Sequence, residues 1–102
     1  MLDILISDQA RADLADIWAY IAEDNIPAAD RLNLKIMNLI RRLAEFPEIG
    51  RERPEITVVA GLRSLPVDNN YLVFYQATED ALRIHRVLHG SMDIPSLFDI
   101  VQ

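Results

Sequence analysis

The stretch ALRIHRVLHG, residues 81–90, decides how the rest of the chain is arranged. Its leucine, isoleucine and valine residues are typical of a β-strand, and its final glycine ends the run. No other part of the chain is so rich in cationic and titratable groups, which here are Arg83, His85, Arg86 and His89. The stretch therefore predicts a strand that either performs chemistry or meets a partner.

Working outward from this strand, the spacing of apolar residues predicts the element order β-α-α-β-β-β. Ser7 has the character of an N-cap, Pro27 suits the first turn of a helix, and Pro47 ends one. The short connection between the two helices predicts that they are antiparallel neighbours. The expected bounds are strands 2–7, 62–67, 71–78 and 81–89, and helices 8–24 and 27–46.

These elements predict an α+β fold, in which a helical hairpin packs on one face of a small, mostly antiparallel sheet. A length of 102 residues suits one domain, 1–102. The strand 71–78 is apolar on both faces, which suits a central strand covered on both sides. Because one hairpin covers one face only, the other face must meet either the tail 90–102 or a partner. The tail itself is expected to form a short helix or an edge segment.

Composition excludes several classes of protein. The chain has no cysteine and two histidines, so neither a thiolate nucleophile nor a cysteine- or histidine-rich metal site is expected. It has no apolar run long enough to span a bilayer and no signal-peptide pattern, which predicts a cytoplasmic protein without membrane contact. The net charge of −6 opposes broad nucleic-acid binding, and the acidic excess is concentrated in residues 1–30.

Several motifs, taken in order, resemble one family. They are DLADIWAYIAEDN on the first helix, the FPEIGR that follows the second, GLRSLPV, YLVFY and IHRVLHGSMD. Together they are similar to the ParE branch of the ParE/RelE superfamily, toxins of type II toxin–antitoxin modules that include plasmid stabilisation proteins. The resemblance runs over about residues 1–95.

The resemblance implies a small bacterial toxin that binds DNA gyrase and traps its cleavage complex, with no enzymatic step and no cofactor. It also implies a ParD-like antitoxin that neutralises the toxin by forming a complex with it. Contact with operator DNA would then come only indirectly, through the antitoxin.

The candidate residues for toxicity lie on the terminal strands and the tail. Arg86 stands out because a simple alternation places it on the same face as Leu82, Ile84 and Leu88. There a charged group needs either a buried partner or an opening to a cleft. Arg63 is expected on a neighbouring strand, where it would join Arg86 in one basic patch. The full set of candidates for target binding is Arg63, Arg83, Arg86, His89 and Met92.

The antitoxin is expected to cover the free sheet face and the helical hairpin. Its candidate contacts are apolar or aromatic residues of the two helices. Leu34 lies opposite the core stripe of its helix and Met37 to one side of it, and Trp18, from the stripe of the first helix, and Tyr20 would lie nearby. Asp13 and Asp16, three residues apart on the first helix, are interpreted as a solvated face because no further ligands accompany them.

Two alternatives stay open. RelE relatives cut mRNA on the ribosome, which requires basic groups around the phosphate and a group that moves protons. Here His89 with Arg83 and Arg86 forms a thin set, and no tyrosine follows Tyr75. The second alternative is a non-toxic module that binds antitoxin and has lost its target. Arg86→Ala is expected to reduce toxicity and to preserve antitoxin binding, unless Arg86 is structural.

Overall fold

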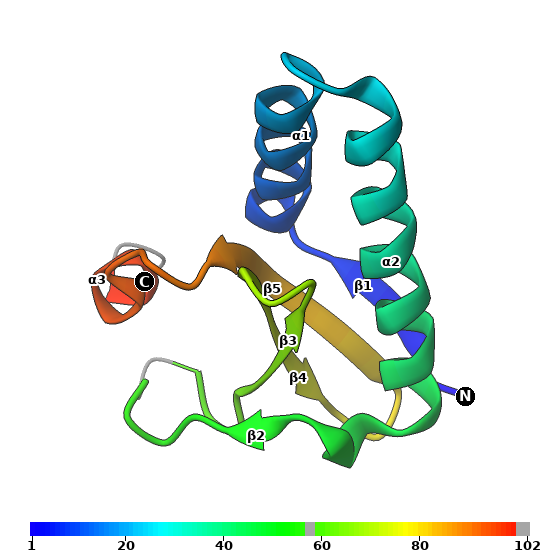
Figure 1. Cartoon of the computed structure of the whole chain (residues 1–102). Helices are drawn as coiled ribbons and strands as arrows, with labels where there is room; N and C mark the ends of the chain where they lie inside the picture. The colour runs from blue at the N-terminus through cyan, green and yellow to red at the C-terminus, as the bar shows by residue number, and fades with distance from the viewer. Residues whose placement is uncertain (57–58, 100–102) are drawn as a thin grey trace.

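The structure is a computed structural model that describes residues 1–56 and 59–99. Two helices and a five-stranded sheet form its main body, and a short C-terminal helix packs on the far side (Figure 1). The elements are β1 (Asp3–Ile6), α1 (Asp8–Ala22), α2 (Ile26–Glu45), the 3₁₀ turn η1 (Pro47–Ile49), β2 (Arg51–Glu52), β3 (Arg63–Val67), β4 (Tyr71–Ala77), β5 (Ala81–His89) and α3 (Ile94–Asp99). The predicted α+β fold is confirmed, and β2 is an element that the sequence did not predict.

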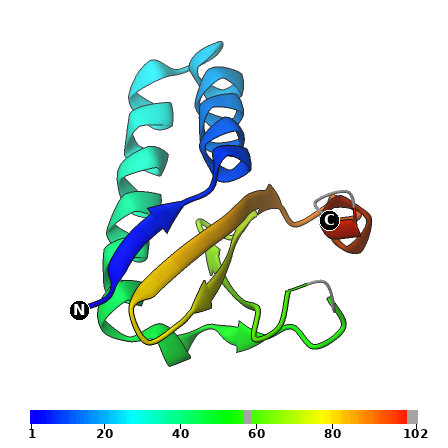
Figure 2. The ribbon, with the colours of Figure 1, turned by 180° about the vertical axis from the view of Figure 1, so that it is seen from behind.

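The strands lie in the order β1-β5-β4-β3-β2. The first strand pairs with the last in parallel, with Asp3 opposite Ala81, and every other neighbouring pair is antiparallel. Figure 2, which shows the molecule from behind, has β1 (blue) lying along β5 (yellow-orange). The expectation that Arg63 lies on a strand next to β5 is wrong, because β4 separates β3 from β5.

Local chemistry fixes the starts of the two long helices, at Ser7 as predicted and at Asn25, which the sequence did not single out. The Ser7 side chain accepts a hydrogen bond from the Ala10 N–H at 3.0 Å, which satisfies one of the free donors at the start of α1. Asn25 caps α2 in the same way, through the Ala28 N–H, and a proline follows in the first turn. The β3–β4 turn places Asp68 and Asn69 at positive φ, a conformation that Asp and Asn tolerate better than most residues.

A β-bulge in β5 changes which side chains share a face. Phe74 pairs with Arg86 and Tyr75 pairs with Ile84, so β5 contains one extra residue at His85. As a result, Leu82 and Ile84 join the core under the helices, whereas Leu88 belongs to the cluster on the opposite face. The expectation that these three share one face with Arg86 is wrong, because a strict period of two does not survive a bulge.

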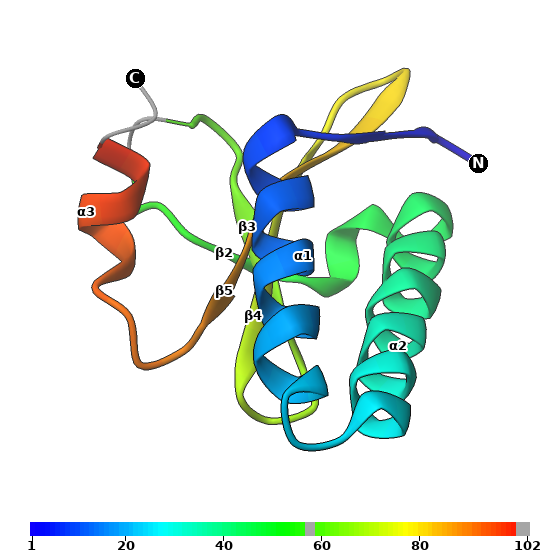
Figure 3. The same cartoon turned by 90° about the horizontal axis from the view of Figure 1, so that it is seen from above.

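Both faces of the sheet are buried, by different elements. Under α1 and α2 the core includes Val73 and Tyr75 of β4. On the far face Phe98 of α3 packs against Phe74, with ring centroids 5.2 Å apart. Seen from above, the strands lie between α3 and the helical hairpin (Figure 3). The sequence predicted that either the tail or a partner covers the second face of the central strand. In the structure the tail covers it, through α3. None of the helices in 1–56 and 59–99 is long and apolar enough to cross a membrane.

Candidate functional site

A groove runs between α1 and the end of β5. Its volume is about 570 Å³. We call it the α1–β5 groove. Its lining contains two of the candidate residues for toxicity and one of the candidates for antitoxin binding. The lining residues are Asp13, Asp16, Ile17, Tyr20, Asn70, Tyr71, Val87, Leu88, His89, Ser91 and Met92.

A buried ion pair ties the two walls of the groove together. Arg86 donates from Nε to Asp13 Oδ2 at 2.8 Å and from Nη2 to Asp13 Oδ1 at 2.9 Å. The two side chains are only 15% and 12% exposed. The hydrogen bond with Asp13 raises the pKa of Arg86 above its usual value, although burial acts in the opposite direction. Asp13 is therefore not on a solvated face, and that expectation is wrong.

The same carboxylate also holds the backbone of β5 after the bulge. The Val87 N–H donates to Asp13 Oδ2 at 3.0 Å, and at the bulge itself the Ser7 hydroxyl donates to the carbonyl of His85 at 2.8 Å. These bonds compensate backbone groups that a regular ladder would otherwise pair. The sequence predicted that Arg86 has either a buried partner or an opening to a cleft. The structure gives it a buried acidic partner, Asp13.

Beyond this point β5 presents His89 and the chain turns towards Met92. The His89 ring packs edge-on against Tyr71, with ring centroids 5.3 Å apart. The Ser91 N–H donates to His89 Nδ1 at 3.1 Å, which orients the ring. Met92 is 49% exposed. His89 and Met92 thus share the groove, as two of the five predicted toxicity residues.

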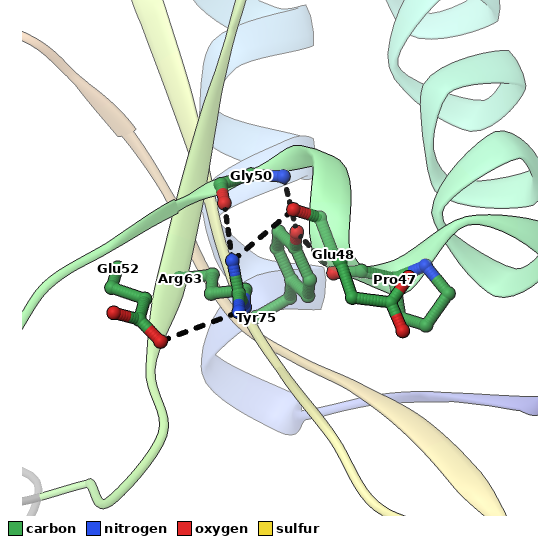
Figure 4. A network of polar contacts seen from close by, with 6 residues as sticks. All are labelled: Pro47, Glu48, Gly50, Glu52, Arg63 and Tyr75. Atoms are coloured by element: carbon green, nitrogen blue, oxygen red, sulfur yellow. Dashed lines mark hydrogen bonds and ion pairs between the residues drawn. The ribbon is translucent and has the colours of Figure 1, made fainter.

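Arg63 lies elsewhere and supports a loop. Its guanidinium donates to the carbonyls of Glu48 and Gly50 at 3.1 and 2.7 Å, and it pairs with Glu52 at 3.3 Å (Figure 4). The Tyr75 hydroxyl completes this arrangement by donating to the carbonyl of Pro47 and accepting from the Gly50 N–H, at 2.7 and 2.8 Å. Figure 4 shows these groups together, and we call them the loop-anchoring network.

Arg83 and His85 are not among the residues that line the α1–β5 groove; both line a smaller hollow of about 220 Å³ beside Leu5 of β1. His85 lies at 3.4 Å from the side-chain oxygen of Gln76. Burial, and secondarily the charge of Arg83, lowers the pKa of His85 below its ordinary value. The structure therefore separates the basic residues of the stretch 81–90. Arg83 and His85 line the smaller hollow, whereas Arg86 and His89 lie at the α1–β5 groove or in its wall.

The predicted antitoxin contacts are also divided. Trp18 donates from its indole nitrogen to Asp30 at 2.8 Å and so links α1 to the start of α2. Tyr20 faces the α1–β5 groove, Leu34 is exposed on α2, and Met37 packs against the main core. The sequence-based selection missed Tyr71, which lies in β4 and joins the groove only through the sheet register.

With the arrangement in place, comparison with known proteins gives the family. Residues 4–94 match the family model described as the ParE toxin of the type II toxin–antitoxin system parDE. The chain belongs to this family. It is a toxin of a type II toxin–antitoxin system, and the predicted membership of the ParE/RelE superfamily is confirmed.

Two curated proteins of Caulobacter vibrioides are similar to this ParE-family chain. Toxin RelE2 is 32% identical over 91 residues, which cover 89% of the chain and 98% of RelE2. Toxin ParE1 is 33% identical over 89 residues, which cover 86% of the chain and 88% of ParE1. The two relatives match about equally well and carry different toxin names, so these names do not separate gyrase binding from RNA cleavage.

Solved structures share the fold. The chromosomal ParDE system of P. aeruginosa contains a chain with a TM-score of 0.70 at 21% identity, covering 87% of this chain and 96% of that one. YafQ from E. coli gives a TM-score of 0.56 at 21% identity, covering 89% and 96%. At these identities the likeness supports the helical hairpin on an open, mostly antiparallel sheet.

Proposed function

We propose that this ParE-family toxin acts in the cytoplasm by binding DNA gyrase and trapping its cleavage complex, without a catalytic step of its own. We also propose that a ParD-like antitoxin neutralises it by forming a complex with it. The observation that carries the proposal is the character of the α1–β5 groove. It combines tyrosines, a methionine and acidic side chains, which suit a protein surface better than a phosphate chain.

The ribosome-dependent RNase is supported less well by the placement of the basic residues. Cleavage of RNA needs several cations around one phosphate together with a group that moves protons. Of the candidates for that chemistry, Arg86 is held by Asp13, Arg83 lines the other hollow, and His89 shares its groove with Asp13 and Asp16. The unpaired charge of Asp16, in the groove that His89 also lines, would repel the scissile phosphate.

The test is a supercoiling reaction with purified gyrase, relaxed plasmid, ATP and the purified toxin. We expect loss of supercoiling and accumulation of linear plasmid, and we expect the cognate antitoxin to reverse both. No effect at large molar excess would overturn the gyrase proposal. A ribosome-dependent mRNA cleavage assay, followed by a growth test, would then separate the RNase from a non-toxic antitoxin-binding module.

A further inference from the structure

The α1–β5 groove carries a negative charge that the fold does not balance. Asp13 is neutralised by Arg86, but the Asp16 carboxylate has no hydrogen bond or ion pair with any residue in the part of the chain that the structure describes. The one residue of the lining that can carry a positive charge, His89, already engages Ser91 through Nδ1. A charge in a hollow attracts an opposite charge more strongly than one on a flat surface, because the low-dielectric walls focus its field.

Large apolar side chains accompany this charge. Tyr20 on α1 is 74% exposed and Met92 after β5 is 49% exposed, and Ile17 and Tyr71 also line the groove. Exposed tyrosine and methionine are enriched where proteins bind proteins, since they supply large contact areas, and methionine adapts its shape to a partner. A nucleic acid would meet Asp16 with its phosphates and be repelled, so the occupant that fits is a polypeptide with a cation.

We propose that the α1–β5 groove receives an apolar side chain and a neighbouring lysine or arginine from the surface of gyrase, with Asp16 pairing with the cation. This inference rests on the function proposed above and adds the chemistry of the partner. The apolar side chain would lie between Tyr20 and Met92, and the cation would lie on the α1 wall. Attraction between the groove and the cation would also speed the encounter of the two proteins.

The experiment measures the dissociation constant of full-length toxin from intact gyrase for the wild type, Asp16→Asn and Asp16→Lys. The matched control is Glu23→Gln, which removes the same charge from an exposed residue that does not line the groove. We expect Asp16→Asn to weaken binding about 10-fold and Asp16→Lys about 100-fold, the size expected for a charged hydrogen bond and its reversal. Glu23→Gln is expected to change binding less than about 2-fold, the scale of a solvated surface charge.

Salt and apolar substitutions give independent readouts. Wild-type affinity should fall more steeply between low and high salt than that of Asp16→Asn, because only the wild type keeps the pair. Met92→Ser should weaken binding, whereas Ile26→Ser, at an exposed apolar residue outside the groove, should not. Circular dichroism confirms that each variant is folded, and Asp16 suits this control because its side chain is exposed.

Each outcome decides between the two proposals. If the wild type binds gyrase and Asp16→Lys binds equally well, the groove inference is overturned and the gyrase function stands. If Asp16→Asn and Glu23→Gln weaken binding equally, net charge alone is responsible and the inference is likewise overturned. If the wild type does not bind gyrase at all, the proposed function fails and takes the inference with it.

Discussion

Arg86 and Arg63 were both expected to face a target, and both are engaged within the fold by contrasting partners. Arg86 meets a carboxylate on α1 that is nearly buried with it. Arg63 meets two backbone carbonyls and an exposed glutamate in the loop-anchoring network. The first arrangement depends on charge balance between two elements. The second depends mainly on the course of the backbone around Gly50 and Tyr75.

The comparison teaches that the two regions should fail in different ways. Removing one member of a buried ion pair leaves an uncompensated charge. This charge lowers the stability of the fold even when the volume of the side chains is unchanged. The loop-anchoring network is instead sensitive to volume, because an added Cβ at Gly50 would overlap the hydroxyl oxygen and ring of Tyr75, which is fully buried. Charge substitutions should therefore damage the groove, and volume substitutions should damage the loop.

The largest effect is expected for Asp13→Ala. This substitution leaves Arg86 without its acidic partner and removes the acceptor of the Val87 N–H. It should therefore lower the free energy of unfolding by about 3 kcal/mol. Urea denaturation measures the change. Asp16→Ala is the matched control on the same helix and should stay within about 0.5 kcal/mol, because its exposed carboxylate has no partner among residues 1–56 and 59–99.

A double variant sharpens this prediction. Asp13→Leu combined with Arg86→Met replaces the charged pair by apolar side chains and should recover part of the stability lost in Asp13→Ala. If the double variant is as unstable as Asp13→Ala, the cost lies in the lost Val87 hydrogen bond or in packing. Arg86→Ala also becomes informative, since a loss of toxicity with loss of folding would make Arg86 a structural residue.

An intermediate effect is expected for Gly50→Ala. The backbone of Gly50 is extended and accepts an alanine, so the cost comes from the clash with Tyr75 and should be about 2 kcal/mol. Tyr75→Phe removes the hydroxyl and should cost about 1.5 kcal/mol alone. The two changes together should cost clearly less than their sum.

The control for this prediction is Gly90→Ala, whose added Cβ has its nearest neighbour, the Asn70 carbonyl oxygen, at 3.7 Å. It should change stability by less than about 0.5 kcal/mol. Strict additivity of Gly50→Ala and Tyr75→Phe in denaturation experiments would show that the clash is not with the tyrosine.

The smallest expected effect is a change in how stability depends on pH. It involves His85, which belongs neither to the Asp13–Arg86 pair nor to the loop-anchoring network, so it serves as a baseline for both. Because the folded protein holds the pKa of His85 below its ordinary value, the unfolded chain takes up a proton first as the pH falls. Stability is therefore full above the unfolded pKa of about 6.5 and declines as the pH falls from there towards the folded pKa. His85→Gln should flatten the profile between about pH 7 and pH 5. An unchanged slope would assign the decline to other groups.

Much of the fold could be predicted from the sequence, because helix caps, prolines and apolar spacing act locally. The N-cap at Ser7, the proline in the first turn of α2 and the turn after Val67 all lie where the sequence indicates. The bulge at His85 could not be predicted, since it depends on how Asp13 and Ser7 meet β5 from other elements. The parallel pairing of β1 with β5 is equally non-local, because these strands lie near opposite ends of the described chain.

The candidate site was predicted in part. His89, Met92 and Tyr20 do line one groove, although they were assigned to two different partners. Tyr71 was missed because only the pairing of Tyr71 with His89 brings it there. Asp13 was misinterpreted because a carboxylate on a helix gives no local sign that an arginine far along the chain will bury it. That arginine is 73 positions away.

The parallel pairing of β1 with β5 has a consequence for synthesis. In the described part of the fold β5 is the strand partner of β1, and the Ser7–His85 contact spans 78 positions. A ribosome adds about 5–20 residues per second, so β1 waits several seconds before its partner emerges. The bulge, the Asp13–Arg86 pair and the α1–β5 groove are all completed by the same late strand. A nascent chain thus stays without its groove until β5 and the residues just after it have been synthesised.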